Sequence, residues 1–245
     1  IAKAGIGFAV PEPEHWNARL DSVLNVIYLI FNEGYGASSG DSAVRIDLCA
    51  EALFLARLLD QLRPNEPEVL GLLALLLITY ARAGARIDAQ GGSVSIDDQD
   101  RNQWNHGMIR DGRDCLDRAM TGGAPGPFQI KAAISSLHVT NGKTDWAQIV
   151  RLYDSLARHE PTPIVALNRA VAIAETGELE QAILEFRSLA PDLDNYQPFH
   201  AAFAEYLARA GDIEPALHAY SRAIELAGNE ADKIFLVRRK SRLAH

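Results

Sequence analysis

Apolar residues recur every three or four positions along almost the whole chain, and turn-forming residues separate these stretches at helix-like intervals. This spacing is typical of amphipathic helices and predicts an all-α protein with about ten or eleven of them. The exception is "RIDAQGGSVSI", residues 86–96, where two short alternating runs flank a Gly-Gly pair. Alternation around such a pair predicts one small β-hairpin between helices.

The second half of the chain contains an internal repeat with a period of 34 residues. The matched pairs are Ala170 and Ala204, Ala174 and Ala208, Gly177 and Gly211, Glu178 and Asp212, Ala182 and Ala216, and Phe186 and Tyr220. Small residues let two antiparallel helices approach closely, a glycine ends the first helix, and an aromatic ring fills the gap to the next pair. The period and these positions resemble the tetratricopeptide repeat (TPR).

A fainter copy precedes these two repeats. "DWAQIVRLYDSLARHEP" places Tyr153 33 residues before Phe186 and ends at Pro161. Three stacked units are the minimum expected of a stable solenoid. The sequence therefore predicts TPR-like helical repeats over residues 126–245, with about three helix pairs.

The first half contains two strongly apolar helical segments, "LCAEALFLARLLDQL" and "EVLGLLALLLITYARAGAR". Their apolar faces are wider than a helical repeat requires, so each helix needs neighbours on more than one side. We expect residues 1–125 to form a helical bundle that precedes the solenoid.

"IFNEGYGASSGD", residues 30–41, ends the apolar stretch that begins at Leu20. Gly34 in the left-handed conformation would end this helix, and Asp41 or Ser42 would cap the next one. These roles explain the glycines and serines of the segment.

Asn32, Glu33 and Tyr35 of the same segment are not explained by a helix end. A polar side chain buried without a partner costs about 1–3 kcal/mol. We therefore expect these three residues to have partners, either inside the chain or outside it.

A second polar segment, "DDQDRNQWNHG" (residues 97–107), gathers three aspartates, including Asp98 and Asp100, beside Arg101. Carboxylates this close could hold a divalent cation or act in acid–base chemistry, but the spacing differs from an EF-hand loop. Helix capping and ion pairing with Arg101 are favoured, because negative charge at a helix start is stabilising by about 0.3–1 kcal/mol.

The composition, with 48% hydrophobic and 23% charged residues in 245, indicates a globular protein with one or two cores. A formal net charge of −8 repels nucleic-acid phosphates and anionic lipids. Basic residues are concentrated in the terminal "KIFLVRRKSRLAH". We expect them to complement the end of the last helix rather than to contact DNA.

Signatures of catalysis are missing from the sequence, which has no phosphate-binding loop, zinc-protease motif or nucleophile elbow. Cys49 and Cys115 lack the spacing of a disulfide framework or a metal cluster and suit a reducing cytoplasm. The apolar stretches Leu20–Phe31 and Val69–Ala81 are shorter than the roughly 20 residues of a membrane span. We expect no enzyme activity, no cofactor, no metal and no membrane contact.

Six segments along the chain resemble, in order, the C-terminal half of bacterial extracytoplasmic-function (ECF) RNA polymerase sigma factors that carry a tetratricopeptide extension. They are "VIYLIFNEGYGASSGD", "LCAEALFLARLL", "EPEVLGLLALLL", "DDQDRNQWN", "DWAQIVRLYD" and "PIVALNRAVAIAE". The likeness covers essentially the whole chain, from "AGIGFAVPEP" onward.

In that family, N-terminal modules bind the polymerase and read the promoter. "AGIGFAVP" resembles the junction just after the helix-turn-helix module, so the resemblance implies an extension without its sigma domains. It implies a cytoplasmic, regulatory protein-interaction region in transcription initiation that positions, restrains or activates those domains. The implied partners are the sigma domains of its own polypeptide and the polymerase core, with DNA contacted only through the missing N-terminal domains.

The two polar segments recur in the family as motifs, so the resemblance makes their side chains the candidates for partner binding. These candidates are Asn32, Glu33, Tyr35, Asp98, Asp100 and Arg101.

Two alternatives belong to other functional classes. The front bundle could sense a small molecule or metal, or even act as an enzyme, through a pocket lined by Tyr35, Asp98, Trp104 and His106. The chain could also be a TPR scaffold unrelated to transcription.

Overall fold

In the computed structural model of this protein, residues 16–36, 45–140 and 142–243 are described. The described part is all-α, as predicted, and contains eleven α-helices and three short 3-10 helices. The helices are α1 (Trp16–Tyr35), α2 (Ile46–Leu62), α3 (Pro67–Tyr80), η3 (Ala83–Ala85), η4 (Ile96–Asp98), η5 (Arg101–Gln103), α4 (His106–Ala119), α5 (Pro127–His138), α6 (Trp146–His159), α7 (Pro163–Glu175), α8 (Leu179–Leu193), α9 (Gln197–Arg209), α10 (Ile213–Glu225) and α11 (Glu230–Leu243).

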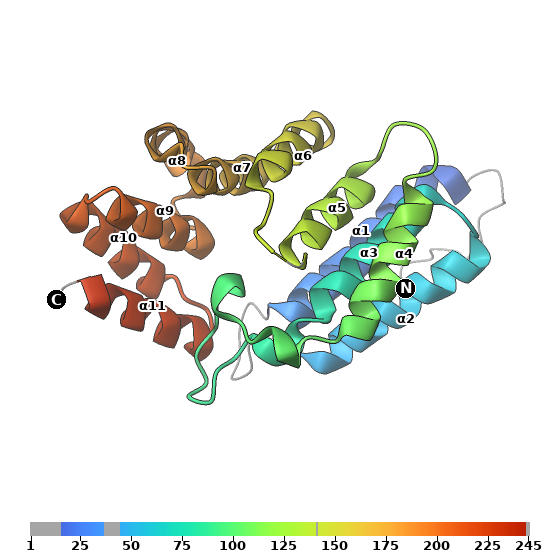
Figure 1. Cartoon of the computed structure of the whole chain (residues 1–245), viewed down its shortest axis with the longest axis horizontal. Helices are drawn as coiled ribbons and strands as arrows, with labels where there is room; N and C mark the ends of the chain where they lie inside the picture. Colours follow the sequence, from blue (N-terminus) through green and yellow to red (C-terminus); the bar gives the residue numbers. More distant parts are fainter. Residues whose placement is uncertain (1–15, 37–44, 141, 244–245) are drawn as a thin grey trace, which may run out of the picture.

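The centre of the front bundle is α3, in which every residue from Val69 to Ile78 is buried. Helices α1 and α2 pair with each other, α4 and α5 contact each other, and all four pack against α3 (Figure 1). Two glycines permit close contacts between these helices. A Cβ on Gly71 of α3 would lie 2.6 Å from the backbone nitrogen of Gln129 in α5, and one on Gly112 of α4 would lie 2.6 Å from Ile78. The wide apolar face predicted for α3 therefore packs against neighbouring helices on several sides.

The segment Pro67–Ala85 has a mean hydropathy of 1.5 and is, among the described residues, the single helix long and apolar enough to cross a membrane. In its most apolar window, 67% is buried inside the protein. The central position of α3 in the bundle accounts for this apolar composition.

The second half stacks helix pairs α5–α6, α7–α8 and α9–α10, followed by α11. The repeat predicted from the sequence is confirmed in detail. Gly177 and Gly211 end α7 and α9 in the left-handed region, with φ of 103° and 86°, a conformation that glycine adopts without steric cost. Most of the paired alanines are buried, and Phe186 and Tyr220 fill the spaces between successive helix pairs.

Hydrogen bonds reinforce this stacking both between helix pairs and within a pair. The Tyr206 hydroxyl of α9 donates to Glu175 of α7 at 2.9 Å, and the Tyr220 hydroxyl of α10 donates to Glu205 of α9 at 2.9 Å. Arg169 of α7 also pairs with carboxylates of α6 and α8, at 2.7 and 2.8 Å. Neighbouring repeats are thus held by polar contacts as well as by apolar packing.

The helices together form an arch (Figure 1): the front bundle is at one end, α6 to α8 pass over the top, and α11 returns toward residues 86–98. The predicted boundary between residues 125 and 126 falls in the turn between α4 and α5. Since α5 packs against both α3 and α6, the division into two domains stays a prediction.

The predicted β-hairpin at residues 86–96 is reduced to one isolated antiparallel bridge, Ile87 with Ser93, around a turn with Gly91 at φ 80°. This turn makes hydrogen bonds to α11. The Ser93 hydroxyl donates to Asp232 at 2.6 Å, and the Ser93 amide donates to the carbonyl of Ala231 at 3.1 Å.

Two ion pairs complete this contact between residues 86–98 and α11, which we call the clasp. Arg238 pairs with Asp88, and Arg239 with Asp98 at 3.3 Å. Gly92 makes room for Arg238, whose guanidinium lies 2.9 Å from the position that a Cβ on Gly92 would occupy. The clasp therefore joins the last helix to the front bundle, and two of the basic residues near the C-terminus have intramolecular partners.

Removing both clasp arginines (Arg238→Ala with Arg239→Ala) should speed amide hydrogen exchange in α11 and in residues 86–98, while α1 to α5 keep their protection. Raising the salt concentration should weaken the difference, because the pairs are partly exposed and therefore screened. Hydrogen exchange followed by mass spectrometry measures both effects.

Arg242→Ala, one turn further along α11 and without an ion pair among the described residues, is the matched control. Equal exchange in the double variant and in this control would rule out a role for the clasp in holding α11.

Candidate functional site

The first polar segment lies at the end of α1. The prediction that Gly34 ends this helix in the left-handed conformation is wrong: the helix continues to Tyr35, and Gly34 is buried within it. A Cβ there would lie 2.8 Å from the backbone nitrogen of Cys49, so this glycine serves close packing of α1 on α2. The predicted caps Asp41 and Ser42 lie outside the described residues.

Tyr35 is held by contacts inside the chain. Its ring stacks on Phe31 with centroids 5.5 Å apart, and the guanidinium carbon of Arg86 lies 4.2 Å from its centroid. Arg86 also donates to the Tyr35 carbonyl oxygen at 2.7 Å. A cation over an aromatic face adds roughly 0.5–2 kcal/mol, so this side chain has a structural role that ties α1 to the segment after α3.

The second polar segment is likewise engaged internally, but its pairing differs from the prediction. Asp98 accepts from Ser95 at 2.6 Å and pairs with Arg239 of the clasp rather than with Arg101. Asp100 caps η5 by accepting from the Asn102 amide at 3.0 Å. The cap of α4 is Asn105 and none of the acids, since its side chain accepts from the Met108 amide at 3.0 Å.

Arg101 extends away from these acids. It donates to the carbonyl of Thr140 at 2.8 Å, and its guanidinium carbon lies 5.0 Å from the ring centroid of Trp104. The structure therefore does not bring the two polar segments together into one site: Tyr35 contacts Arg86, whereas Asp98 contacts Arg239.

The pocket expected from Tyr35, Asp98, Trp104 and His106 is not formed. Trp104 is buried in a small apolar cluster, His106 is exposed at the first turn of α4, and the other two residues have the separate partners described above. Among the described residues, no group of three or more His, Cys, Asp or Glu side chains lies close enough to hold a metal ion.

A polar cavity of about 540 Å³ lies where the bundle meets the solenoid. Helices α1, α3, α5, α6 and α7 line it, together with Tyr196 at the start of α9. Of the candidates from the sequence, Asn32 alone is among its lining residues. We call it the junction cavity.

Five side chains of the junction cavity make no hydrogen bond to any described residue. They are two amides and three tyrosine hydroxyls: Asn32, Asn168, Tyr28, Tyr153 and Tyr196. Each of these groups can both donate and accept a hydrogen bond. A wall of unpaired donors and acceptors beside apolar side chains is the usual composition of a binding site.

Charge in the junction cavity is balanced. Lys131 and Glu160 form an ion pair at 2.7 Å, and the Lys131 ammonium lies 5.0 Å from the ring centroids of Tyr28 and Phe128. Burial, and secondarily the positive charge of Arg82, lowers the pKa of His138 to about 4, so this imidazole is neutral at pH 7. The cavity thus suits a ligand that forms many hydrogen bonds and carries little net charge.

Sequence reasoning missed most of this cavity because its residues come from five helices and the start of a sixth. One signal was available. Asn168 occupies the position equivalent to Ala202 in the next repeat, so it is a polar departure from an otherwise small-residue pattern. Asn168 is exposed and lines the cavity, so its amide is available to a ligand.

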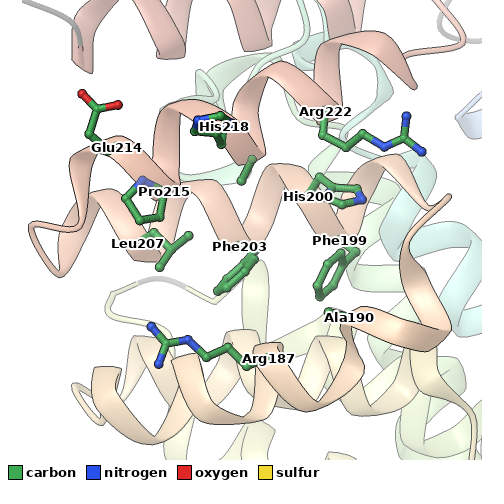
Figure 2. Close-up of a pocket in the computed structure, with 11 residues that line it drawn as sticks. Arg187, Ala190, Phe199, His200, Phe203, Leu207, Glu214, Pro215, His218 and Arg222 are labelled. Atoms are coloured by element: carbon green, nitrogen blue, oxygen red, sulfur yellow. The ribbon is translucent and has the colours of Figure 1, made fainter.

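A second groove, of about 560 Å³, lies between α8 and the α9–α10 pair. Figure 2 shows Phe199 and Phe203 of α9 between Arg187 of α8 and His218 of α10. The other histidine of this groove is engaged internally, since a ring nitrogen of His200 lies 2.8 Å from the carbonyl oxygen of Asp194. This groove is mostly apolar and offers fewer unpaired hydrogen-bonding groups than the junction cavity.

Comparison with known proteins finds a similar family for the front bundle and a similar protein for nearly the whole chain. Residues 19–120, which comprise α2 to α4 and most of α1, match a family of unknown function (DUF6596). An uncharacterized protein of Rhizobium meliloti (strain 1021), R00370, is 42% identical over 239 residues, which are 96% of this chain. The chain spans about half of that relative's length, 56%.

Among solved structures, a similar fold occurs in TTC0263, a thermophilic TPR protein of Thermus thermophilus. The TM-score is 0.54 at 15% sequence identity, covering 91% of this chain and 98% of that one. At this level of identity the similarity concerns the fold alone. The chain is therefore an all-α, TPR-like protein whose front four helices are similar to a family of unknown function.

Proposed function

We propose that this chain is the regulatory, protein-interaction region of an ECF-type RNA polymerase sigma factor, acting in transcription initiation in the bacterial cytoplasm. The proposal is supported by the six ordered segments that resemble such extensions. It is supported also by the junction cavity, whose unpaired polar groups are the single structural observation that carries it. A TPR scaffold with another partner is compatible with the same fold.

The junction cavity suits a segment of polypeptide. Peptide groups present one donor and one acceptor per residue, and the side chains of Asn32 and Asn168 offer both kinds of group. Tyrosine rings add apolar contact area while their hydroxyls make hydrogen bonds. In this proposal the segment comes from the sigma domains or the polymerase core, and DNA is reached only through domains outside these residues.

The function proposed is binding rather than catalysis. Asn32 and Glu33 make the direct contacts at the end of α1, because neither side chain has a hydrogen-bond or ion-pair partner among the described residues. The other four candidates act by holding the local structure, since each is occupied by the internal contacts described above. They are Tyr35 at the end of α1, and Asp98, Asp100 and Arg101 in the segment before α4.

The test is a pull-down with immobilised chain, purified core polymerase and separately expressed sigma domains. The double variant Asn32→Ala with Asn168→Ala should retain roughly tenfold less partner, since each lost hydrogen bond contributes about 0.5–1.5 kcal/mol. The melting temperature should be unchanged, because both amides are exposed and lack internal partners.

Asn25→Ala is the control, an exposed asparagine on the same helix outside the cavity. Retention of both partners by the double variant at the level of this control would contradict the proposal, as would no retention by the unaltered chain.

A small-molecule sensor is the second candidate, favoured by the cavity volume of about 540 Å³, which lies within the roughly 300–1,000 Å³ of ligand pockets. The small-molecule fraction of a bacterial lysate should then raise the melting temperature of the chain. Loss of that increase in Asn168→Ala, without any change in polymerase binding, would favour the sensor over the docking module.

A further inference from the structure

Helix α1 carries a second stripe of residues at alternating spacings of three and four, separate from the stripe buried in the bundle. Its members are Arg19, Ser22, Val26, Leu29 and Glu33. Such spacing places side chains in one row along a helix and is the pattern of a helix that packs against another helix. Within the described structure, this row has no covering helix: Val26 is 55% exposed and Leu29 65% exposed.

Helix α2 carries a matching second stripe, made of Glu51, Leu55, Leu58 and Leu62. Leu58 and Leu62 are 40% and 64% exposed. A groove of about 630 Å³ runs between the two helices, and its lining is almost wholly apolar. We call this surface, formed by the two stripes, the outer face. Contiguous exposed apolar residues of this kind mark an interaction site on a protein surface.

The two helices are antiparallel, as their contacts show. Gly34 at the end of α1 touches Cys49 at the start of α2, and Arg19 and Leu62 line the same groove at the opposite end. The outer face therefore has a basic end and an acidic end. Arg19 marks the first, and Glu33 and Glu51 mark the second.

Among the residues that the structure describes, neither Arg19 nor Glu33 has an ion-pair partner. Val26 lies midway, seven residues from each of them along α1. A rotation of 180° about an axis through Val26, perpendicular to the helix, exchanges the basic and acidic ends. The outer face is thus complementary in charge to a second copy of itself.

We propose that the outer face is a homodimer interface in which two copies pack antiparallel about a two-fold axis near Val26. The helices α1 and α2 of both copies form a four-helix bundle. Its apolar core contains Val26, Leu29, Leu58 and Leu62. Arg19 of each copy faces Glu33 of the other at both ends. Both this interface and the proposed docking function use Glu33, so Val26, which does not line the junction cavity, is the position whose substitution separates them.

The first experiment measures mass by light scattering after size exclusion, across micromolar concentrations of the chain. The expected mass is twice the chain mass of 26.8 kDa. Val26→Glu should give the monomer mass, because it would bury two carboxylates next to each other at the two-fold axis. Val237→Glu, at a valine 44% exposed on α11, is the matched control and should stay dimeric.

The second experiment tests the antiparallel register. Arg19→Glu alone should be monomeric, since it places a second carboxylate opposite Glu33, and Glu33→Arg alone should be monomeric for the converse reason. An equimolar mixture of these two variants should again give dimers, because every pair across the mixed interface then joins opposite charges.

A chain that is monomeric throughout overturns the proposal and leaves the outer face to another partner. A dimer that persists in Val26→Glu overturns it as well, because association then uses a different surface. If Val26→Glu is monomeric but the mixture of charge variants does not re-form dimers, the antiparallel arrangement is excluded.

Discussion

Replacing Gly71 with alanine is expected to lower the free energy of unfolding by at least about 2 kcal/mol, although alanine is intrinsically the better helix former by about 1 kcal/mol. The new Cβ would lie 2.6 Å from the backbone nitrogen of Gln129 and 2.9 Å from the carbonyl carbon of Phe128. Backbone atoms of α5 cannot rotate away as a side chain can, so α3 and α5 must separate. Chemical denaturation followed by circular dichroism measures the change.

Gly84→Ala provides the control. The nearest atom to a Cβ at this position, the carbonyl oxygen of Gln103, lies at 3.6 Å, which is an ordinary van der Waals distance. Its effect on the unfolding free energy should stay within about 0.5 kcal/mol. Similar losses for the two variants would show that contact with α5 is not the reason for glycine at position 71.

The second large effect concerns acid stability and the partly buried imidazole of His138. Its folded-state pKa of about 4 lies below the ordinary value of 6.5, because burial, and then the charge of Arg82, disfavours protonation. As the pH falls below 6.5, the unfolded chain binds a proton that the folded chain refuses. Stability is therefore lost between pH 6.5 and 4, by about 3 kcal/mol in total from this residue.

His138→Gln should remove this contribution, so its unfolding free energy should fall less steeply with acidification than that of the unaltered chain. At neutral pH the variant should be somewhat less stable, because the edge contact of His138 with Trp146, centroids 5.2 Å apart, is lost. Denaturation curves at several pH values between 7 and 4 give the comparison. His159→Gln, at an exposed position of α6, controls for loss of an imidazole, and identical slopes for both variants would contradict the assignment.

The two binding surfaces proposed for this chain lie on different parts of the fold. The junction cavity is lined by α1, α3, α5, α6 and α7, whereas the outer face is formed by the sides of α1 and α2 that do not pack on α3. Both helices of the outer face lie almost wholly within residues 19–120, the region similar to the family of unknown function. Loss of dimerisation and loss of partner binding can therefore be separated by single substitutions at Val26 or at Asn168, whereas Glu33 takes part in both proposals.

Structural features that depend on a few consecutive residues were predictable from the sequence. Gly177 and Gly211 end their helices in the left-handed conformation, and the alanines of the repeat lie where the helices meet, because both properties depend on a short local pattern. Gly34 was predicted in the same way and wrongly. Glycine serves both turns and close packing, and the contact with Cys49 that decides between them belongs to another helix.

The contacts of the two polar segments were likewise not predictable where the partner lies far along the chain. Helix capping in the second segment was expected, but not that Asp98 pairs with Arg239, 141 positions away along the chain. The junction cavity was not predicted, although one of its lining residues, Asn32, was a candidate for partner binding. Tyr28, Tyr153 and Tyr196 are ordinary residues in their own segments. They gather because the arch brings five helices and the start of α9 around one space.

The amino-acid sequence by itself determined that this protein is all-α, where its helical repeats lie, and that their turns need glycine. These properties follow from periodicity and backbone conformation, which act over a few residues. The tertiary structure alone decided that a short turn contacts the last helix and that amides and hydroxyls from distant segments share one cavity. It also decided that one apolar face has no covering helix among the described residues. Those outcomes depend on which distant segments meet, and a local pattern carries no information about its distant partner.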